Sequence, residues 1–317
     1  MIVMSNARKV IDRNFILFTI RIVGCTSFRS LVVMLEFFVR QFRARVRLVH
    51  YTASIVNFWH PWLFKVQIPV VSCCNLNCKS CGTCAPLAKG EFADLSEIEK
   101  DLCELSRKIS ISTIGLIGGE PLLHPEIEKF PFVIRKSYPK AVLTLSTNGI
   151  RLPEMPQTFW NAMKENKVII LLQCYPPFKH KLREYFRLAG EKRVRIVFAP
   201  HNWYFYRYSF DADTSMREKN YAVCTDRMVC HQLWRSKLYL CPRHWLRAYN
   251  HYFGTSHEIL KGYDIYKYSG WELQKLMKRS DPCCRYCTFL RNPVETEWDY
   301  SKHERWEWCA DDGIPME

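Results

Sequence analysis

The sequence predicts an α/β fold in which a parallel sheet curls into an open barrel, followed by a small cysteine-rich region. Between residues 66 and about 200, short apolar runs alternate with helical stretches, and this alternation is typical of parallel βαβ units with right-handed crossovers. In the last third of the chain, cysteines cluster at uneven spacing. The length of 317 residues allows one large core or two domains.

The apolar runs predict strands over residues 68–72, 113–116, 142–146, 168–173 and 194–198. Helices are predicted between them over residues 96–109, 126–137, 157–165 and 179–189, with Asp94 or Ser96 as the N-cap of the first. Three polar segments follow predicted strands: SCCNLNCKSC, GGEPLLHP and STNGI. In barrels of this kind the chemistry lies at the C-terminal ends of the strands, so we expect these segments to meet.

The first segment contains the spacing Cys-x3-Cys-x2-Cys, made by Cys74, Cys78 and Cys81. Three thiolates can bind three irons of a 4Fe–4S cluster and leave the fourth iron without a protein ligand. An open metal position distinguishes a reactive site from a closed structural one. A zinc knuckle is the alternative interpretation of the cysteines alone.

With the runs Gly118-Gly119-Glu120-Pro121 and Ser146-Thr147-Asn148-Gly149, this spacing resembles the radical S-adenosylmethionine (radical SAM) superfamily over roughly residues 66–317. The resemblance implies a partial (βα)6-type TIM barrel and a 4Fe–4S cluster on Cys74, Cys78 and Cys81 whose open iron takes SAM. It further implies reductive cleavage of SAM to a 5′-deoxyadenosyl radical, which abstracts hydrogen from a substrate.

The resemblance assigns the methionine amino group of SAM to Gly118, Gly119 and Glu120. It assigns further SAM contacts to Ser146, Thr147 and Asn148, although for any one of these a plain turn role is an equal alternative. Two features depart from the family pattern. Only five strands can be counted, since residues 201–221 give no convincing sixth unit. Ser80 stands where an aromatic residue usually packs near the adenine.

The C-terminal third carries seven further cysteines, six of them between residues 224 and 287. The segment CHQLWRSKLYLCP predicts a hairpin turning at Arg235-Ser236, which pairs Trp234 with Lys237 and sets Cys230 opposite Cys241. With the pair in CCRYC, this resembles the SPASM or "twitch" auxiliary domain of many radical SAM enzymes. The resemblance implies an auxiliary 4Fe–4S cluster on Cys230, Cys241, Cys284 and Cys287, with Cys224 as the alternative to Cys230. A zinc ion on the same thiolates is the competing interpretation, and a Cys230–Cys241 disulfide is a weaker one.

The net charge of +15 is partly local, because residues 1–60 carry nine basic side chains against Asp12 and Glu36. Such a segment suits an anionic membrane surface, and packing of a helix on the barrel is an equal alternative. No nucleic-acid-binding module is recognised, so no nucleic acid partner is expected. Clustered cysteines without an uncharged run near the ~20 residues of a bilayer span favour metal binding in a reducing cytoplasm over a secreted disulfide framework.

We therefore predict three regions: a basic helical extension (1–64), a radical SAM barrel (65–215) and a SPASM/twitch-like region (216–317). The expected partners are a flavodoxin- or ferredoxin-type electron donor and a peptide, protein or sugar substrate. The closing segment EWDYSKHERWEW is expected to pack against the auxiliary region. The rival function is a non-catalytic zinc- or iron–sulfur-binding adaptor, which would not need the Gly118–Glu120 strand end.

Overall fold

The computed structural model describes residues 60–173, 175–198, 204–207, 217–224, 227–241, 262–282, 284 and 294–308. The chain divides into two compact units, Met1–Phe58 and Trp59–Glu317, and all described residues belong to the second. The predicted extension over residues 1–64 therefore lies almost wholly outside the described residues. Within the described part, none of the helices has the length and apolar character that crossing a membrane requires.

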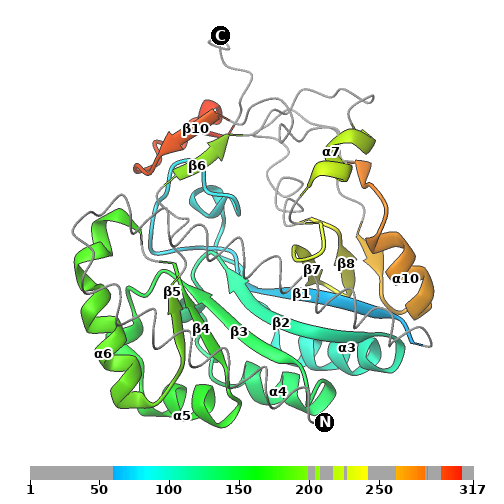
Figure 1. Ribbon diagram of the computed structural model, residues 1–317, viewed down its shortest axis with the longest axis horizontal. Coiled ribbons are helices and arrows are strands. Elements are labelled where there is room, and N and C mark those ends of the chain that lie inside the picture. Colours follow the sequence, from blue (N-terminus) through cyan, green and yellow to red (C-terminus); the bar gives the residue numbers. More distant parts are fainter. Residues whose placement is uncertain are drawn as a thin grey trace, which may run out of the picture. The chain divides into compact units, whose positions relative to one another are not determined.

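An eight-stranded sheet with the order β5-β4-β3-β2-β1-β7-β8-β9 forms the centre of the second unit. Its first five strands in the sequence are all parallel to one another: β1 (Trp62–Val71), β2 (Ser110–Gly118), β3 (Val142–Thr147), β4 (Ile169–Leu172) and β5 (Ile196–Phe198). All five predicted strands are confirmed, and β1 begins six residues before the predicted one. The sheet curves, and the helices lie along its outer side (Figure 1).

Four helices connect these strands and bury an apolar face against the sheet: α3 (Leu95–Lys108), α4 (Phe130–Ser137), α5 (Gln157–Glu165) and α6 (Leu182–Lys192). All four predicted helices are confirmed. The Asp94 carboxylate caps α3 by accepting hydrogen bonds from the backbone N–H groups of Ser96 (2.7 Å) and Glu97 (3.0 Å). Short 3-10 turns complete the connections: η1 (Ala85–Leu87), η2 (Pro121–Leu123), η3 (Leu152–Glu154) and η4 (Pro176–Lys181).

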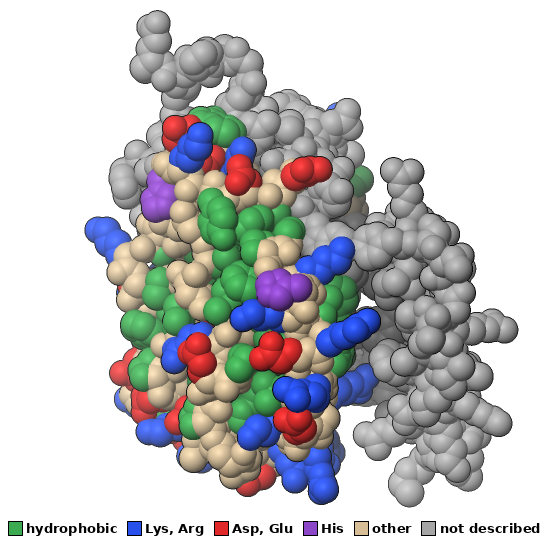
Figure 2. Space-filling view, turned by 90° about the vertical axis from the view of Figure 1, so that its left-hand side faces the viewer, with side chains coloured by type: hydrophobic (Ala, Val, Ile, Leu, Met, Phe, Trp, Pro, Cys, Tyr) green, Lys and Arg blue, Asp and Glu red, His purple; other side chains and the backbone are tan. Residues whose placement is uncertain are grey.

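Among the described residues, no further strand pairs with the outer edge of β5, so the parallel sheet is consistent with a partial barrel, and its six-unit form stays a prediction. The next strand, β6 (Tyr204–Arg207), forms a separate two-stranded sheet with β10 (Val294–Glu297). Its ladder hydrogen bonds are made with antiparallel β10 and not with β5. The side of the molecule that carries α6 exposes several hydrophobic side chains (Figure 2), and Phe186 on α6 and Val197 on β5 are both exposed.

The C-terminal hairpin joins the sheet beside β1 and does not form a sheet of its own. Strand β7 (His231–Trp234) pairs in parallel with β1, and β8 (Lys237–Tyr239) pairs with β7 and β9 (Tyr263–Asp264). The predicted turn is confirmed, with Trp234 opposite Lys237 and positive φ at Arg235 (47°) and Ser236 (57°). Two successive positive φ values define the type I′ turn that suits the twist of a hairpin.

A buried carboxylate explains how serine is accommodated in this turn. Asp101 of α3 accepts hydrogen bonds from the Ser236 backbone N–H (3.0 Å), the Ser236 hydroxyl (2.9 Å) and the Tyr266 hydroxyl (3.0 Å). The side chain thus fixes the turn to the barrel. Two more helices, α7 (Arg217–Val223) and α10 (Gly270–Met277), and the 3-10 turn η7 (Arg305–Glu307) belong to the same C-terminal region.

Candidate functional site

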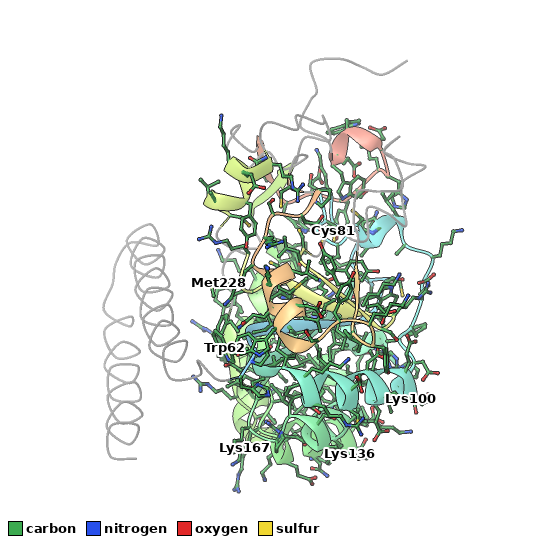
Figure 3. The ribbon with its side chains drawn as sticks, turned by 90° about the vertical axis from the view of Figure 1, so that its right-hand side faces the viewer. Trp62, Cys81, Lys100, Lys136, Lys167 and Met228 are labelled. Carbon is green, nitrogen blue, oxygen red and sulfur yellow. The ribbon has the colours of Figure 1, made fainter. Side chains whose placement is uncertain are left out.

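The three polar segments follow β1, β2 and β3 and meet at the C-terminal edge of the sheet. Hydrogen bonds link them: Gly119 N–H donates to the Val71 carbonyl (2.8 Å), and Glu120 N–H donates to the Cys73 carbonyl (3.0 Å). In Figure 3, Cys81 lies above the sheet, at the end opposite to Lys136 and Lys167. Because Lys167 lies two residues before β4, that opposite end is where the parallel strands begin.

Each of the three cysteine sulfurs has a group beside it that can donate a hydrogen bond. The Cys74 sulfur receives the Leu76 backbone N–H (3.3 Å) and, more weakly, the Asn148 side-chain amide (3.7 Å). The Cys78 sulfur receives the indole N–H of Trp298 (3.2 Å). The Cys81 sulfur lies 3.3 Å from the Thr83 hydroxyl. Donors around a sulfur stabilise its anionic form, and hydrogen bonds of this kind surround the sulfurs of iron–sulfur sites.

Burial and mutual repulsion oppose the ionisation of these thiols when no cation is present. The pKa of Cys74 is raised to about 12, first by burial and then by the negative charges of Glu120 and Cys81, against the lowering effect of the Leu76 hydrogen bond. The pKa of Cys78 is raised well above its usual value, first by burial and then by Cys81 and Cys74. Three thiolates can therefore share this loop only when a cationic centre compensates their charge.

The three thiols form a donor set that suits a 4Fe–4S cluster. Within the described residues, no three His, Cys, Asp or Glu side chains converge on one ion. A cluster binds each thiolate through a different iron, so its ligands stand farther apart than those of one zinc ion. Soft thiolates are the ligands that such clusters select.

The two glycines of the GGE segment allow the end of β2 to pack directly on the start of the cysteine loop. A Cβ atom at Gly118 would lie 2.2 Å from the Val71 carbonyl oxygen, and one at Gly119 would lie 2.0 Å from the Cys73 carbonyl oxygen. This close approach is to the chain's own backbone, so these glycines set the position of Cys73 and, through it, of Cys74.

The Glu120 side chain is fully buried and already bonded within the protein. Its Oε1 accepts the Thr147 hydroxyl (2.6 Å) and the Leu122 N–H (3.0 Å), and its Oε2 accepts the Asn148 N–H (2.8 Å). Burial raises its pKa to about 7, against the opposing effect of the Thr147, Asn148 and Leu122 donors. A carboxylate offers about four acceptor positions, so roughly one remains for an ammonium group. The main action of Glu120 here is to hold the ends of β2 and β3 together.

The serine–threonine–asparagine segment connects β3 to the cysteine loop. The Asn148 amide donates to the Asn75 side-chain oxygen (2.8 Å), and its own oxygen accepts the Ile150 N–H (3.0 Å). The Thr147 hydroxyl is used by Glu120, whereas Ser146 is only half-buried. The structure therefore brings Ser146, Thr147 and Asn148 to the predicted edge and gives the last two an organising role there.

Tyr175, which follows β4, also lies at this edge. Burial raises its pKa well above the usual value, and the negative charges of Cys78, Cys81, Cys74 and Glu120 act in the same direction. The phenol is thus within electrostatic reach of all three cysteines.

The C-terminal segment over residues 298–308, which we call the strap, contacts the cysteine loop directly. Besides the Trp298 contact, the Ser301 N–H donates to the Asn77 carbonyl (2.9 Å) and the Trp308 indole donates to the Cys81 carbonyl (2.9 Å). Trp308 also packs with Cys84 and with Trp234 and Tyr239 of the β7–β8 hairpin. The sequence predicted that this segment packs against the auxiliary region, and it did not predict the contact with the cysteine loop. The several tryptophans of EWDYSKHERWEW were the sequence signal that could have indicated the contact with the cysteine loop.

The described cysteines of the second group lie on three segments. The confirmed hairpin register extends to Gln232 opposite Tyr239 and, continued two residues outward, places Cys230 opposite Cys241. Cys224 follows α7, and the Asn220 amide donates to the Cys284 carbonyl (2.8 Å). Cys284 and Cys224 both raise the pKa of Tyr221, although burial is the larger cause. Cys287 lies outside the described residues.

Residues 68–198 match the family model described as Radical SAM superfamily. Two curated relatives are the GTP 3′,8-cyclase of Clostridium acetobutylicum, 34% identical over 94 residues, and that of Geobacter sulfurreducens, 35% identical over 95 residues. These segments make up 28% of this chain in both cases, and 29% and 28% of the two relatives. The chain thus spans less than a third of the length of these relatives.

Solved structures with a similar course of the chain include BtrN in complex with AdoMet and 2-DOIA. That likeness has 17% identity and a TM-score of 0.46, over 78% of this chain and 98% of BtrN. A second is anSMEcpe with bound AdoMet, at 21% identity and a TM-score of 0.36, over 44% and 43% of the two chains.

The family match covers the strands, the cysteine loop and the two polar segments described above. The cofactors of this superfamily are a 4Fe–4S cluster and SAM, and the residues at the sheet edge fit the cluster. Residues 68–198 of this chain are therefore similar in sequence to the radical SAM superfamily, and they carry side chains that fit its cluster.

Proposed function

We propose that this chain reductively cleaves SAM at a 4Fe–4S cluster bound by Cys74, Cys78 and Cys81, and that the resulting radical abstracts hydrogen from a substrate. The observation that carries the proposal is the provision of a hydrogen-bond donor for each of three sulfurs at one sheet edge. When bound, the cluster supplies the electron that breaks a carbon–sulfur bond of SAM.

The protein's own residues orient the reactants and exclude water. Gly118 and Gly119 fix the cysteine loop, and Glu120 fixes the ends of β2 and β3. The remaining acceptor position of Glu120 suits the amino group of SAM. Ser146 is the most accessible polar group of its segment, so we assign it a direct SAM contact and assign Thr147 and Asn148 a positioning role.

Anaerobic reconstitution tests the proposal. Protein loaded with iron and sulfide, then given SAM and dithionite, is expected to release 5′-deoxyadenosine, and Cys78→Ala is expected to abolish the release. Cys103→Ala is the matched control, because Cys103 is exposed on α3 and outside the cysteine loop. A colourless zinc form that does not cleave SAM would instead support the adaptor function.

For the C-terminal cysteines we propose an auxiliary 4Fe–4S cluster in a SPASM/twitch-like region. Cys230, Cys241, Cys284 and Cys287 are the ligands, with Cys224 as the alternative to Cys230. The hairpin register supports the first pair, while the shared influence on Tyr221 supports Cys224 beside Cys284. Cys74, Cys78 and Cys81 replaced together by alanine should leave about half of the iron. An iron-free triple variant would contradict a second cluster.

The substrate class and the electron donor are also proposals. A peptide, protein or sugar substrate and a flavodoxin- or ferredoxin-type electron donor follow from the resemblance to SPASM/twitch enzymes. The GTP 3′,8-cyclase matches span too little of those relatives to transfer their reaction. Assays with GTP, with a candidate peptide and with an aminosugar, each read by 5′-deoxyadenosine release, separate these classes.

For residues 1–60 we propose peripheral contact with an anionic membrane from the cytoplasmic side, supported by their nine basic side chains. Binding to vesicles that contain phosphatidylserine should weaken as salt rises, because salt screens surface charge. Binding that is absent, or that salt does not change, would contradict the proposal. It would favour the alternative that the segment is an ordinary packed helix.

A further inference from the structure

The strap runs antiparallel to the cysteine loop and is joined to it by backbone hydrogen bonds. Cys78 and Tyr300 form an antiparallel bridge. The Lys79 N–H donates to the Asp299 carbonyl (2.8 Å), and the Asn77 side-chain amide donates to the Ser301 carbonyl (2.8 Å). The loop that carries the second and third cysteines therefore takes part of its shape from a segment more than two hundred residues away in the sequence.

The other end of the strap is anchored at the third cysteine. The Ser80 hydroxyl donates to the Glu307 carbonyl, and the Trp308 indole donates to the Cys81 carbonyl. Glu307 is fully buried, and its carboxylate accepts the Ser301 hydroxyl (2.5 Å) and the Lys302 N–H (2.6 Å). These contacts hold the strap in a closed turn, so its first residues have little freedom to move.

Trp298 lies at the start of this anchored segment. Its indole N–H is 3.2 Å from the Cys78 sulfur, and its ring packs edge-on against Tyr300 with 4.8 Å between the ring centres. Cys78 is buried, with 4% of its surface exposed. A donor fixed against a buried sulfur acts without competition from water, which strengthens the interaction.

We propose that Trp298 is a positioning residue that raises the reduction potential of the cluster bound by Cys78, and that the strap holds it in place. This inference rests on the proposed function, since it requires a cluster on Cys74, Cys78 and Cys81. One electron from an external reductant adds negative charge to the cluster and its sulfur ligands. An N–H donor to the sulfur stabilises the reduced form more than the oxidised form, and hydrogen bonds to sulfurs are among the determinants of cluster potential.

Redox titration of the reconstituted full-length protein, read by electron paramagnetic resonance, tests the inference. Trp298→Phe keeps the ring and removes the N–H, so we expect a more negative midpoint potential. Trp306→Phe is the matched control, because Trp306 belongs to the same strap but its indole donates to the Glu304 carboxylate. We expect its potential to equal that of the wild type. Equal potentials for Trp298→Phe and the wild type would overturn the inference.

A measurement on the wild type covers the case in which Trp298→Phe does not fold. Protein grown with indole-15N tryptophan, with its cluster reduced, should show a 15N coupling in electron–nuclear double resonance. Absence of that coupling in a loaded protein overturns the inference and leaves the proposed function standing. A wild type that binds no cluster through its three loop cysteines overturns the proposed function, and this inference with it.

Discussion

Replacing Gly119 by alanine is expected to disrupt both the fold and the cluster site. The added Cβ would lie 2.0 Å from the Cys73 carbonyl oxygen, 2.4 Å from the Cys73 carbonyl carbon and 2.8 Å from the Ser72 carbonyl oxygen. All three obstacles are backbone atoms, so no side chain can rotate away. The end of β2 and the start of the cysteine loop must therefore separate.

The cost follows from the size of that movement. Real Cβ atoms essentially never approach closer than 3.0 Å, so the Cβ–oxygen distance must grow by about 1 Å. The movement strains two backbone hydrogen bonds, from Gly119 to Val71 (2.8 Å) and from Glu120 to Cys73 (3.0 Å), each of which contributes about 1 kcal/mol. With ~1–3 kcal/mol for overpacking, the free energy of unfolding should fall by at least about 3 kcal/mol. At a few degrees per kcal/mol, the melting temperature falls by at least ~6 °C.

Two measurements check this expectation. Thermal unfolding of the cluster-free protein gives the stability change, and iron content after reconstitution reports the displacement of Cys74. Gly82→Ala is the control, because Gly82 lies inside the cysteine loop and a Cβ there meets no atom within 4 Å. We expect that control to unfold within about 0.5 kcal/mol of the wild type. If Gly119→Ala kept wild-type stability and iron content, the close packing of β2 on the loop would be refuted.

Two further predictions concern buried carboxylates. Because burial raises the pKa of Glu120 to about 7, its contribution to stability is fully present below the unfolded value of about 4.5 and is lost as pH rises through 7. The stability advantage of the wild type over Glu120→Gln should thus shrink by about 3 kcal/mol between pH 4.5 and 8, measured by urea unfolding of cluster-free protein; an advantage that does not change with pH would contradict the assignment. Asp101→Ala should cost ~2–4 kcal/mol, because it leaves the donors of Ser236 and Tyr266 without an acceptor. Asp94→Ala, at an exposed helix cap, should cost only about 1 kcal/mol, and equal costs for the two variants would argue against the buried network.

Much of the barrel could be predicted because its signals are local. The alternation of apolar runs and amphipathic stretches located the five parallel strands and four helices within a few residues. The turn at Arg235-Ser236 fixed the hairpin register, since side-chain pairing in a hairpin follows directly from the turn. The position of the three polar segments at one sheet edge followed from the common direction of parallel strands.

The partners of these elements could not be predicted, because they are far apart in the sequence. Nothing near β7 specifies that it pairs in parallel with β1. Nothing near Glu120 shows that its carboxylate is used by Thr147 and Asn148. Each pairing depends on which surfaces remain after the local elements form, and that is a property of the whole fold.

The sequence by itself determined the cysteine spacing, the glycine–glycine–glutamate strand end and the alternation of strands and helices in the parallel units, because each is encoded within a few neighbouring residues. Only the tertiary structure decided what surrounds the thiolates. It brings Trp298 to Cys78 across 220 residues and turns Gly118 and Gly119 toward the chain's own backbone. The physical reason is that a donor near a buried sulfur, or a missing Cβ against a carbonyl, has an energetic effect only once distant segments are packed together.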